Sequence, residues 1–340
     1  MTSELPVFRL GFGGFSPSQQ QVIVDAIQKS AAGSKQWIVG DDLAEADAWW
    51  MNGARVQVLG DQRVRVGAGN PGGKSIQLYL PDIDRPVAFS VPVAVSTFRP
   101  NYTFDPTSAA SMTEVLGKVD AWLAPQSVQF RLASYIAERQ RDLGGDVFDV
   151  YLRGSIIAVV DMRGDIGVSP TLGAEGLEQS FWQKREHAVI PEHFARTSMS
   201  MLMWHYGTRT QRDLLPRHYR VGPLYFRRPP RIAQRLIRDS HLLMLREMAR
   251  EPVSFPALLK RTGWTEVFLS QTLAALYLVG AITSSPKRAA PHLRPVRPEG
   301  VSVQGPPSDL STFDSVPPSL PPQLAHRPPD MTAPAPLRIN

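Results

Sequence analysis

Cysteine is absent from this 340-residue sequence, and no uninterrupted apolar run is long enough to span a membrane. The lack of cysteine excludes disulfides, thiolate metal sites and cysteine nucleophiles, and it is typical of a reducing compartment. A membrane-spanning helix needs about 20 consecutive apolar residues, so no membrane partner is expected. No basic flank followed by an apolar run indicates a secretory signal. We therefore expect a soluble, cytoplasmic protein.

Local signatures of catalysis and of metal binding are also missing. His187 and His193 stand beside Glu186 and Glu192, but their spacing is not that of a zinc-binding helix, and Pro191 interrupts the segment. The sequence has no GxSxG motif, which marks the nucleophile of many serine hydrolases. We therefore predict a non-enzymatic protein with no catalytic residues, no metal site and no cofactor.

One glycine-rich segment keeps an enzymatic alternative open. Residues 68–75, AGNPGGKS, fit a relaxed phosphate-loop pattern in which Lys74 would reach the outer phosphates of a nucleotide. A phosphate loop is followed by a helix, whereas residues 76–80, IQLYL, alternate between apolar and polar as a strand does. A hairpin loop is therefore favoured, and a nucleotide hydrolase that uses this loop is an alternative.

The first hundred residues alternate between strand-like and helix-like patterns. The strand-like run VFRLGFGGF precedes a helix that opens at Ser16-Pro17, and apolar strand patterns follow at residues 36–39 and 48–51. This alternation is typical of a partly parallel sheet covered by helices. A hairpin and further extended runs complete the segment. We predict an α/β domain over residues 1–100.

Residues 46–53, ADAWWMNG, resemble the third strand of a response-regulator receiver domain. In receivers this strand carries the phosphoacceptor aspartate, and the matching position here is Asn52. Leu10-Gly11-Phe12-Gly13 stands where a receiver carries its acidic pair. The resemblance therefore implies a degenerate receiver-like domain that neither accepts phosphate nor holds magnesium.

The middle and the end of the chain differ in composition. Residues 101–208 predict a mixed α+β region, with helical patterns over 105–145 and 176–208 and a hairpin-like stretch between them. Residues 284–340 contain fourteen prolines and few large apolar side chains. Such a stretch cannot bury enough apolar surface to offset its ordering entropy, so we predict a disordered, proline-rich tail.

Residues 240–283 carry the most specific architectural pattern in the sequence. Three short helices followed by a strand occur in the order of a winged helix-turn-helix. Ser254 predicts the N-cap of the second helix, and Gly263 its end. Thr265 predicts the cap of the third helix, and Gly280 its end. We predict an α-rich, winged-helix-like module.

The third helix lacks the basic side chains that a DNA-reading helix offers to base edges. No lysine or arginine occurs between Thr265 and Gly280, and Glu266 would oppose phosphate. Contact with another regulatory protein is therefore favoured, and a DNA-binding transcription regulator is the alternative. The residues predicted to contact the partner or nucleic acid are Glu266, Val267, Ser270, Gln271, Lys260 and Arg261.

Positive charge is concentrated just before this module. Between residues 209 and 250, eleven arginines stand against three acids, a net charge of +8, whereas the whole chain carries +6. Arg231, Arg235 and Arg238 are spaced to share one helix face, on which guanidinium groups would bind phosphate oxygens. Solvated arginines, or arginines paired with acids elsewhere in the fold, are the alternative. The predicted anion-binding residues are Arg227, Arg228, Arg231, Arg235 and Arg238.

These patterns together predict a bacterial-style signalling or regulatory adaptor. It would act through protein–protein contacts and through a basic surface that binds an anion such as a cyclic dinucleotide. The predicted organisation is an α/β domain (1–100), a mixed region (101–208), an Arg-rich segment with the winged-helix-like module (209–283) and the tail (284–340).

Overall fold

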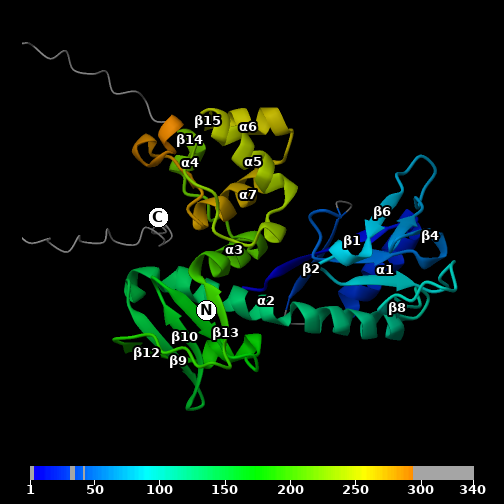
Figure 1. The fold of residues 1–340 in the computed structure, drawn as a ribbon, viewed down its shortest axis with the longest axis horizontal. Helices are drawn as coiled ribbons and strands as arrows, with labels where there is room; N and C mark the ends of the chain where they lie inside the picture. Colours follow the sequence, from blue (N-terminus) through cyan, green and yellow to red (C-terminus); the bar gives the residue numbers. More distant parts are fainter. Residues whose placement is uncertain (1–3, 31–34, 41–42, 294–340) are drawn as a thin grey trace, which may run out of the picture.

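The computed structural model describes residues 4–30, 35–40 and 43–293. An α/β domain lies on one side, and a long helix leads from it to a second sheet, above which a helical module packs (Figure 1). None of the described helices combines the length and the apolar content needed to cross a bilayer.

The α/β domain is built on a five-stranded sheet in the order β2-β1-β3-β7-β8, in which every neighbouring pair is parallel. Helix α1 (Pro17–Ser30) and the first half of α2 cover one face, where Phe8, Leu10 and Trp50 are buried. The predicted parallel-sheet α/β region is therefore confirmed. Its strands are β1 (Val7–Gly13), β2 (Gln36–Gly40), β3 (Ala48–Met51), β7 (Val87–Ser90) and β8 (Tyr102–Phe104).

A three-stranded antiparallel sheet covers the other face, with Val64 and Leu78 packed against Met51 and Phe89 of the parallel sheet. Its strands are β4 (Val56–Gly60), β5 (Arg63–Val66) and β6 (Ile76–Tyr79). The glycine-rich residues 68–75 connect β5 to β6, which pair antiparallel. The predicted hairpin is confirmed, and the nucleotide-hydrolase alternative lacks the helix that a phosphate loop requires.

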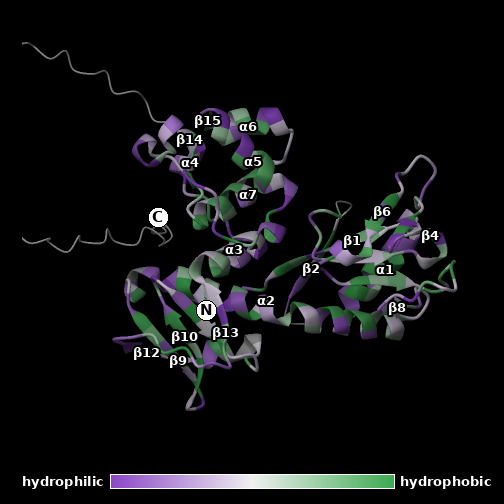
Figure 2. Ribbon diagram, viewed as in Figure 1, coloured by the Kyte–Doolittle hydropathy of each residue, from purple (hydrophilic) through white to green (hydrophobic). Residues whose placement is uncertain are grey.

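Helix α2 (Ala109–Leu143) runs through both halves of the molecule. It starts after Ser108, whose side chain accepts a hydrogen bond from the Ser111 N–H, and ends at Gly144, which has a positive φ. Side chains of its first half, such as Val119, belong to the core of the α/β domain, and those of its second half, such as Ile136, belong to the core of the second sheet. Figure 2 shows apolar and polar residues along the whole helix. One helix therefore joins two cores.

The second sheet is antiparallel, in the order β12-β9-β10-β11-β13. The helical pattern predicted over residues 176–208 is wrong for two of these strands. Residues 181–185 pair in register with β9, and this tertiary pairing outweighs the local pattern. The strands are β9 (Val147–Leu152), β10 (Ser155–Asp161), β11 (Asp165–Val168), β12 (Phe181–Arg185) and β13 (Ala195–Ser198).

The helical module begins with α3 and ends with β16. The predicted caps are confirmed: the side chains of Ser254 and Thr265 accept backbone hydrogen bonds, and Gly263 and Gly280 have positive φ. The central strand of its small β15-β14-β16 sheet comes from before the first of the three predicted helices. The elements are α3 (Met199–Arg209), α4 (His218–Val221), β14 (Pro223–Phe226), α5 (Asp239–Arg250), β15 (Val253–Ser254), α6 (Phe255–Thr262), α7 (Glu266–Leu278) and β16 (Ile282–Thr283).

Helix α7, the third helix of the predicted module, is buried on almost every side. Its neighbour α3 packs along it, and Gly207 of α3 lies directly against Ala275. Ser270, predicted to face a partner or nucleic acid, is buried. The prediction of a free outer face is therefore wrong for most of α7. Residues 213–220 contact Ser270 and Tyr277, and α3 packs against Ala275.

Gly207→Val is expected to destabilise the fold by roughly 1–3 kcal/mol. A Cβ atom at this position would lie 2.9 Å from the Ala275 Cα and 2.9 Å from the Leu278 Cδ1, so the two helices would have to separate. Urea denaturation measures the change. Gly117→Ala in α2 is the control, since nothing lies within 4 Å of its added Cβ. An equal effect of both variants would contradict the packing of α3 on α7.

The predicted disordered tail starts too early. Ala289, Ala290 and Leu293 are buried and pack against Tyr225 and Phe226. These apolar side chains give residues 284–293 enough contact with β14 to be part of the fold. The rest of the predicted tail, 294–340, lies outside the described residues.

Candidate functional site

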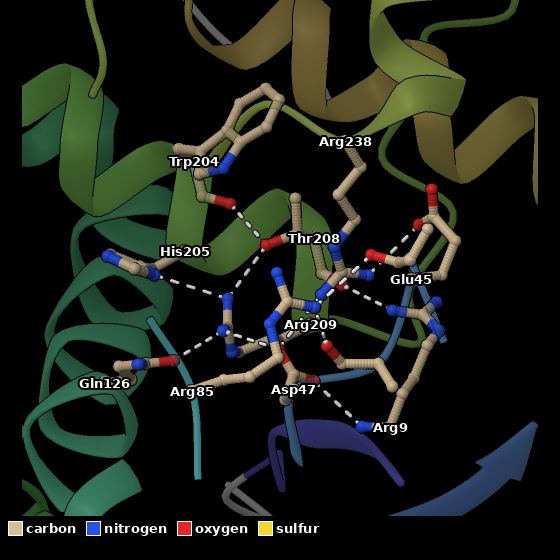
Figure 3. A network of polar contacts seen from close by, with 12 residues as sticks. Arg9, Glu45, Asp47, Arg85, Gln126, Trp204, His205, Thr208, Arg209 and Arg238 are labelled. Atoms are coloured by element: carbon tan, nitrogen blue, oxygen red, sulfur yellow. Dashed lines mark hydrogen bonds and ion pairs between the residues drawn. The ribbon is translucent and has the colours of Figure 1, made fainter. Parts of the chain in front are cut away.

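A buried cluster of ion pairs connects the α/β domain to the helical module (Figure 3). We call it the junction and define it as Arg9, Glu45, Asp47, Arg209 and Arg238. Arg9 lies on β1, and the two acids immediately precede β3. Arg209 ends α3, and Arg238 precedes α5. Segments that are far apart in the sequence therefore meet here.

Asp47 is the centre of the junction. Its Oδ1 accepts hydrogen bonds from the Nη2 atoms of Arg209 (3.0 Å) and Arg238 (2.9 Å), and its Oδ2 accepts one from the backbone N–H of Arg9 (2.8 Å). The side chains of Asp47 and Arg209 are each only 6% exposed. Burial alone would raise the pKa of Asp47, but Arg209, Arg238 and the Arg9 N–H together hold it below its ordinary value. The carboxylate is therefore ionised and held by several donors.

Glu45 extends the junction to the first turn of α5. Its carboxylate accepts hydrogen bonds from Arg238 Nη1 (3.2 Å) and from the Ser240 hydroxyl (2.7 Å). Three arginines stand against two acids in the junction, and burial lowers the pKa of Arg209 to about 10. The junction therefore carries an excess of positive charge in a poorly solvated place.

Two buried histidines border the junction. Burial, reinforced by Arg209, lowers the pKa of His205 to about 3, and burial with Arg238 and Arg9 lowers that of His241 to about 3. The Nη1 of Arg209 lies 3.3 Å from His205 Nδ1, and an arginine nitrogen can only donate. Both imidazoles are therefore neutral in the folded chain.

A cleft of about 590 Å³ opens beside the junction, at the amino-terminal edge of the parallel sheet. We call it the cleft. A smaller hollow of about 60 Å³ adjoins it and is lined by Asp47, Arg209 and Arg238. The cleft is therefore next to the junction. The polar and aromatic residues that line it include Arg85, Arg99, Asn101, Tyr102, Trp122 and Arg235.

The opposite, carboxyl edge of the sheet, where open α/β sheets usually bind ligands, is closed by internal hydrogen bonds. The Asn52 side chain donates to the Gly14 carbonyl (3.0 Å) and accepts from the Ala54 N–H (3.1 Å). The Ser90 hydroxyl accepts from the Gly53 N–H (3.0 Å). Asn52 thus caps a short 3-10 turn, and the polar groups around it are engaged.

The predicted anion-binding arginines do not share a helix face. Residues 227–238 contain only a short 3-10 turn, Gln234–Leu236, before α5 begins. On this non-helical path Arg238 forms ion pairs with Glu45 and Asp47, and these long-range contacts outweigh the local helical spacing. Arg238 joins the junction, Arg235 lines the cleft, and Arg231 is exposed away from both. The backbone N–H groups of Arg227 and Arg228 donate to the Ala281 carbonyl. The alternative prediction, that these arginines pair with acids elsewhere in the fold, is confirmed for Arg238, which pairs with Glu45 and Asp47.

The predicted partner-contact residues are divided between two places. Glu266, Val267 and Gln271 line a hollow of about 310 Å³ at the start of α7, which we call the α7 hollow. Ser270 lies in its wall, where its hydroxyl donates to Asp213 (2.9 Å) and accepts from Arg220 (2.8 Å). The other two residues, Lys260 and Arg261, lie on α6, where Arg261 pairs with Glu247 and Glu251.

Sequence reasoning missed most of the junction and most of the cleft. Arg209 belongs to the arginine-rich segment, but no local pattern connects it to Asp47, which is 162 residues away. The one signal in the sequence is the excess of arginines over acids between residues 209 and 250, because any of these arginines that is buried requires an acid from elsewhere in the fold. No comparable signal points to Trp122 or Arg99.

No protein-family model, curated protein or solved structure matches this chain.

Proposed function

We propose that this protein is a signalling or regulatory adaptor that acts through protein–protein contacts and responds to an anion at its basic surface. The junction is the observation that carries this proposal. Two acids of the α/β domain hold arginines from α3 and from the segment leading into α5. A shift of the α/β domain must either move these helices or break buried ion pairs, so the two parts are coupled.

The strand order of the α/β domain supports a receiver-like role. The order β2-β1-β3-β7-β8 is that of flavodoxin-like sheets, the architecture that receivers use. Asn52, at the position matching the phosphoacceptor, is a hydrogen-bonded cap with no carboxylate to phosphorylate. We infer that regulation is by ligand or partner rather than by phosphoryl transfer at this position.

The α7 hollow is the proposed protein-contact surface. Val267 is 66% exposed there, and Leu214 lies in the same hollow. An ion pair between Arg220 and Glu266 (2.6 Å) lies beside them. An apolar centre with a polar rim is the usual anatomy of a protein interface.

Val267→Asp is expected to weaken capture of the partner by at least about tenfold, because a charge would replace an apolar contact in the interface. The measurement is a pull-down from the source cells with the full chain as bait. Val189→Asp is the control, since Val189 is 77% exposed in the loop between β12 and β13. A partner captured equally well by Val267→Asp would contradict the assignment of this surface, and capture of none would contradict the adaptor function.

The DNA-binding alternative has less support. Helix α7 would have to enter the major groove, but α3 covers it, and its exposed end carries Glu266. Random-sequence duplex DNA at low salt tests this alternative directly, since a backbone-binding protein loses affinity as salt rises.

A further inference from the structure

We propose that the cleft binds a nucleotide, with its base on the indole of Trp122 and its phosphate on Arg99 and Arg235. The effect of binding on the helical module rests on the proposed regulatory function. The site itself rests on the residues that line the cleft.

The size and position of the cleft suit a small ligand. It lies between the starts of β7 and β8, the middle of α2 and the 3-10 turn Gln234–Leu236. Its volume of about 590 Å³ falls inside the range of about 300–1,000 Å³ typical of ligand sites. Four separate segments of the chain therefore offer side chains to one concave site.

Two guanidinium groups of the cleft are uncommitted. Arg99 and Arg235 are exposed, and neither has a hydrogen bond or an ion pair with any described residue. Arg85 differs, because it donates to the Ala46 carbonyl (2.6 Å) and pairs with Asp84 (3.4 Å). Guanidinium forks bind phosphate oxygens bidentately, so the two free groups are suited to a phosphate.

Trp122 provides a flat apolar platform at the same site. Its side chain is 42% exposed on α2, although it lines both the cleft and the smaller hollow. It stacks on no other aromatic ring within the described parts of the chain. Exposed aromatic side chains beside arginines are the usual means of holding a base and its phosphate together.

Other polar groups in the cleft favour a nucleobase over a plain anion. Asp84 also lines it, and this carboxylate would repel a polyanion but accept hydrogen bonds from the N–H groups of a base. The Asn101 carboxamide and the Tyr102 hydroxyl can donate and accept. A ligand that carries phosphate, a flat ring and N–H donors fits all of these groups, and a nucleotide has all three.

A ligand in the cleft would contact both the α/β domain and the segment that leads into α5. Arg99 belongs to the α/β domain, whereas Arg235 stands three residues before Arg238 of the junction. A phosphate bridging Arg99 and Arg235 would restrain the segment that leads into α5. The ligand would thereby fix the α/β domain relative to the surface proposed to contact a partner.

Isothermal titration calorimetry of the full chain tests the site. The probes are AMP, GMP, cyclic di-AMP and cyclic di-GMP, with guanosine and inorganic pyrophosphate as partial ligands. We expect at least one nucleotide to bind more tightly than either partial ligand. Arg235→Ala and Trp122→Ala should each weaken it by at least about tenfold. The matched control Arg231→Ala, an exposed arginine of the same segment outside the cleft, should change the affinity by less than about twofold.

Three outcomes would overturn the proposal. One is that no probe binds at millimolar concentration. Another is that a nucleotide binds unchanged to Arg235→Ala and Trp122→Ala. A third is that pyrophosphate binds as tightly as any nucleotide and Trp122→Ala has no effect, which would mean an anion site only. Partner capture through Val267 is a separate measurement, so failure of the nucleotide site and failure of the adaptor function are distinguishable.

Discussion

Asp47→Asn is expected to lower the free energy of unfolding by roughly 3–5 kcal/mol, the usual effect of removing one partner from a buried ion pair. The substitution keeps the size of the side chain but removes the charge that Arg209 and Arg238 share. Arg209 would then lose its ion pair, and Arg238 would keep the one with Glu45, so two guanidinium groups would share less negative charge in a poorly solvated site. Urea denaturation of the purified full chain measures the difference.

Asp84→Asn is the matched control for this variant. Asp84 also pairs with an arginine, Arg85, but its side chain is 34% exposed. Exposed pairs contribute about 0–1 kcal/mol, so this variant should unfold close to the wild type. A change below about 1 kcal/mol for Asp47→Asn would show that the junction does not stabilise the fold.

Acidification from pH 7 to pH 5 is expected to lower the unfolding free energy by about 4 kcal/mol through His205 and His241. Both have pKa values of about 3 in the folded chain and an ordinary value of 6.5 when unfolded. Between about pH 6.5 and pH 3 the unfolded chain therefore binds more protons than the folded chain. The stability that the two neutral imidazoles contribute above pH 6.5 is lost progressively as the pH falls through this range.

The matching control is the double variant His205→Gln with His241→Gln. It removes both titrating groups, so the dependence of stability on pH between 7 and 5 should largely disappear even if the variant is less stable overall. The lowered pKa of Asp47 does not interfere, because its ordinary value of 3.8 places its effect below that window. If the unfolding free energy of the double variant fell with pH as steeply as that of the wild type, the two imidazoles would not be held neutral in the folded chain.

Local interactions explain which parts of the fold are predictable from the sequence. The helix caps at Ser254 and Thr265 and the ends at Gly263 and Gly280 are decided by groups within a few residues of each other. The hairpin loop over residues 68–75 was predictable for the same reason, because the alternation that follows it belongs to β6.

Long-range contacts explain what the sequence does not reveal. Strand β12 forms only because β9 is available to pair with it. The regular spacing of Arg231, Arg235 and Arg238 predicts a helix, but the segment forms only the 3-10 turn Gln234–Leu236. Arg238 pairs instead with Asp47, 191 residues away. The burial of α7 was indicated by its apolar residues, which lie on all sides of the helix from Leu269 to Leu278, but no pattern within α7 identifies α3 as the helix that packs on it.

Amide hydrogen exchange of the full chain, compared between wild type and Asp47→Asn, measures whether the junction couples the α/β domain to the helical module. We predict faster exchange in α3 and in the first turns of α5, on the far side of the broken ion pairs, with unchanged protection in the strands β9 and β10. Faster exchange confined to residues 43–51, with α3 and α5 as protected as in the wild type, would contradict it.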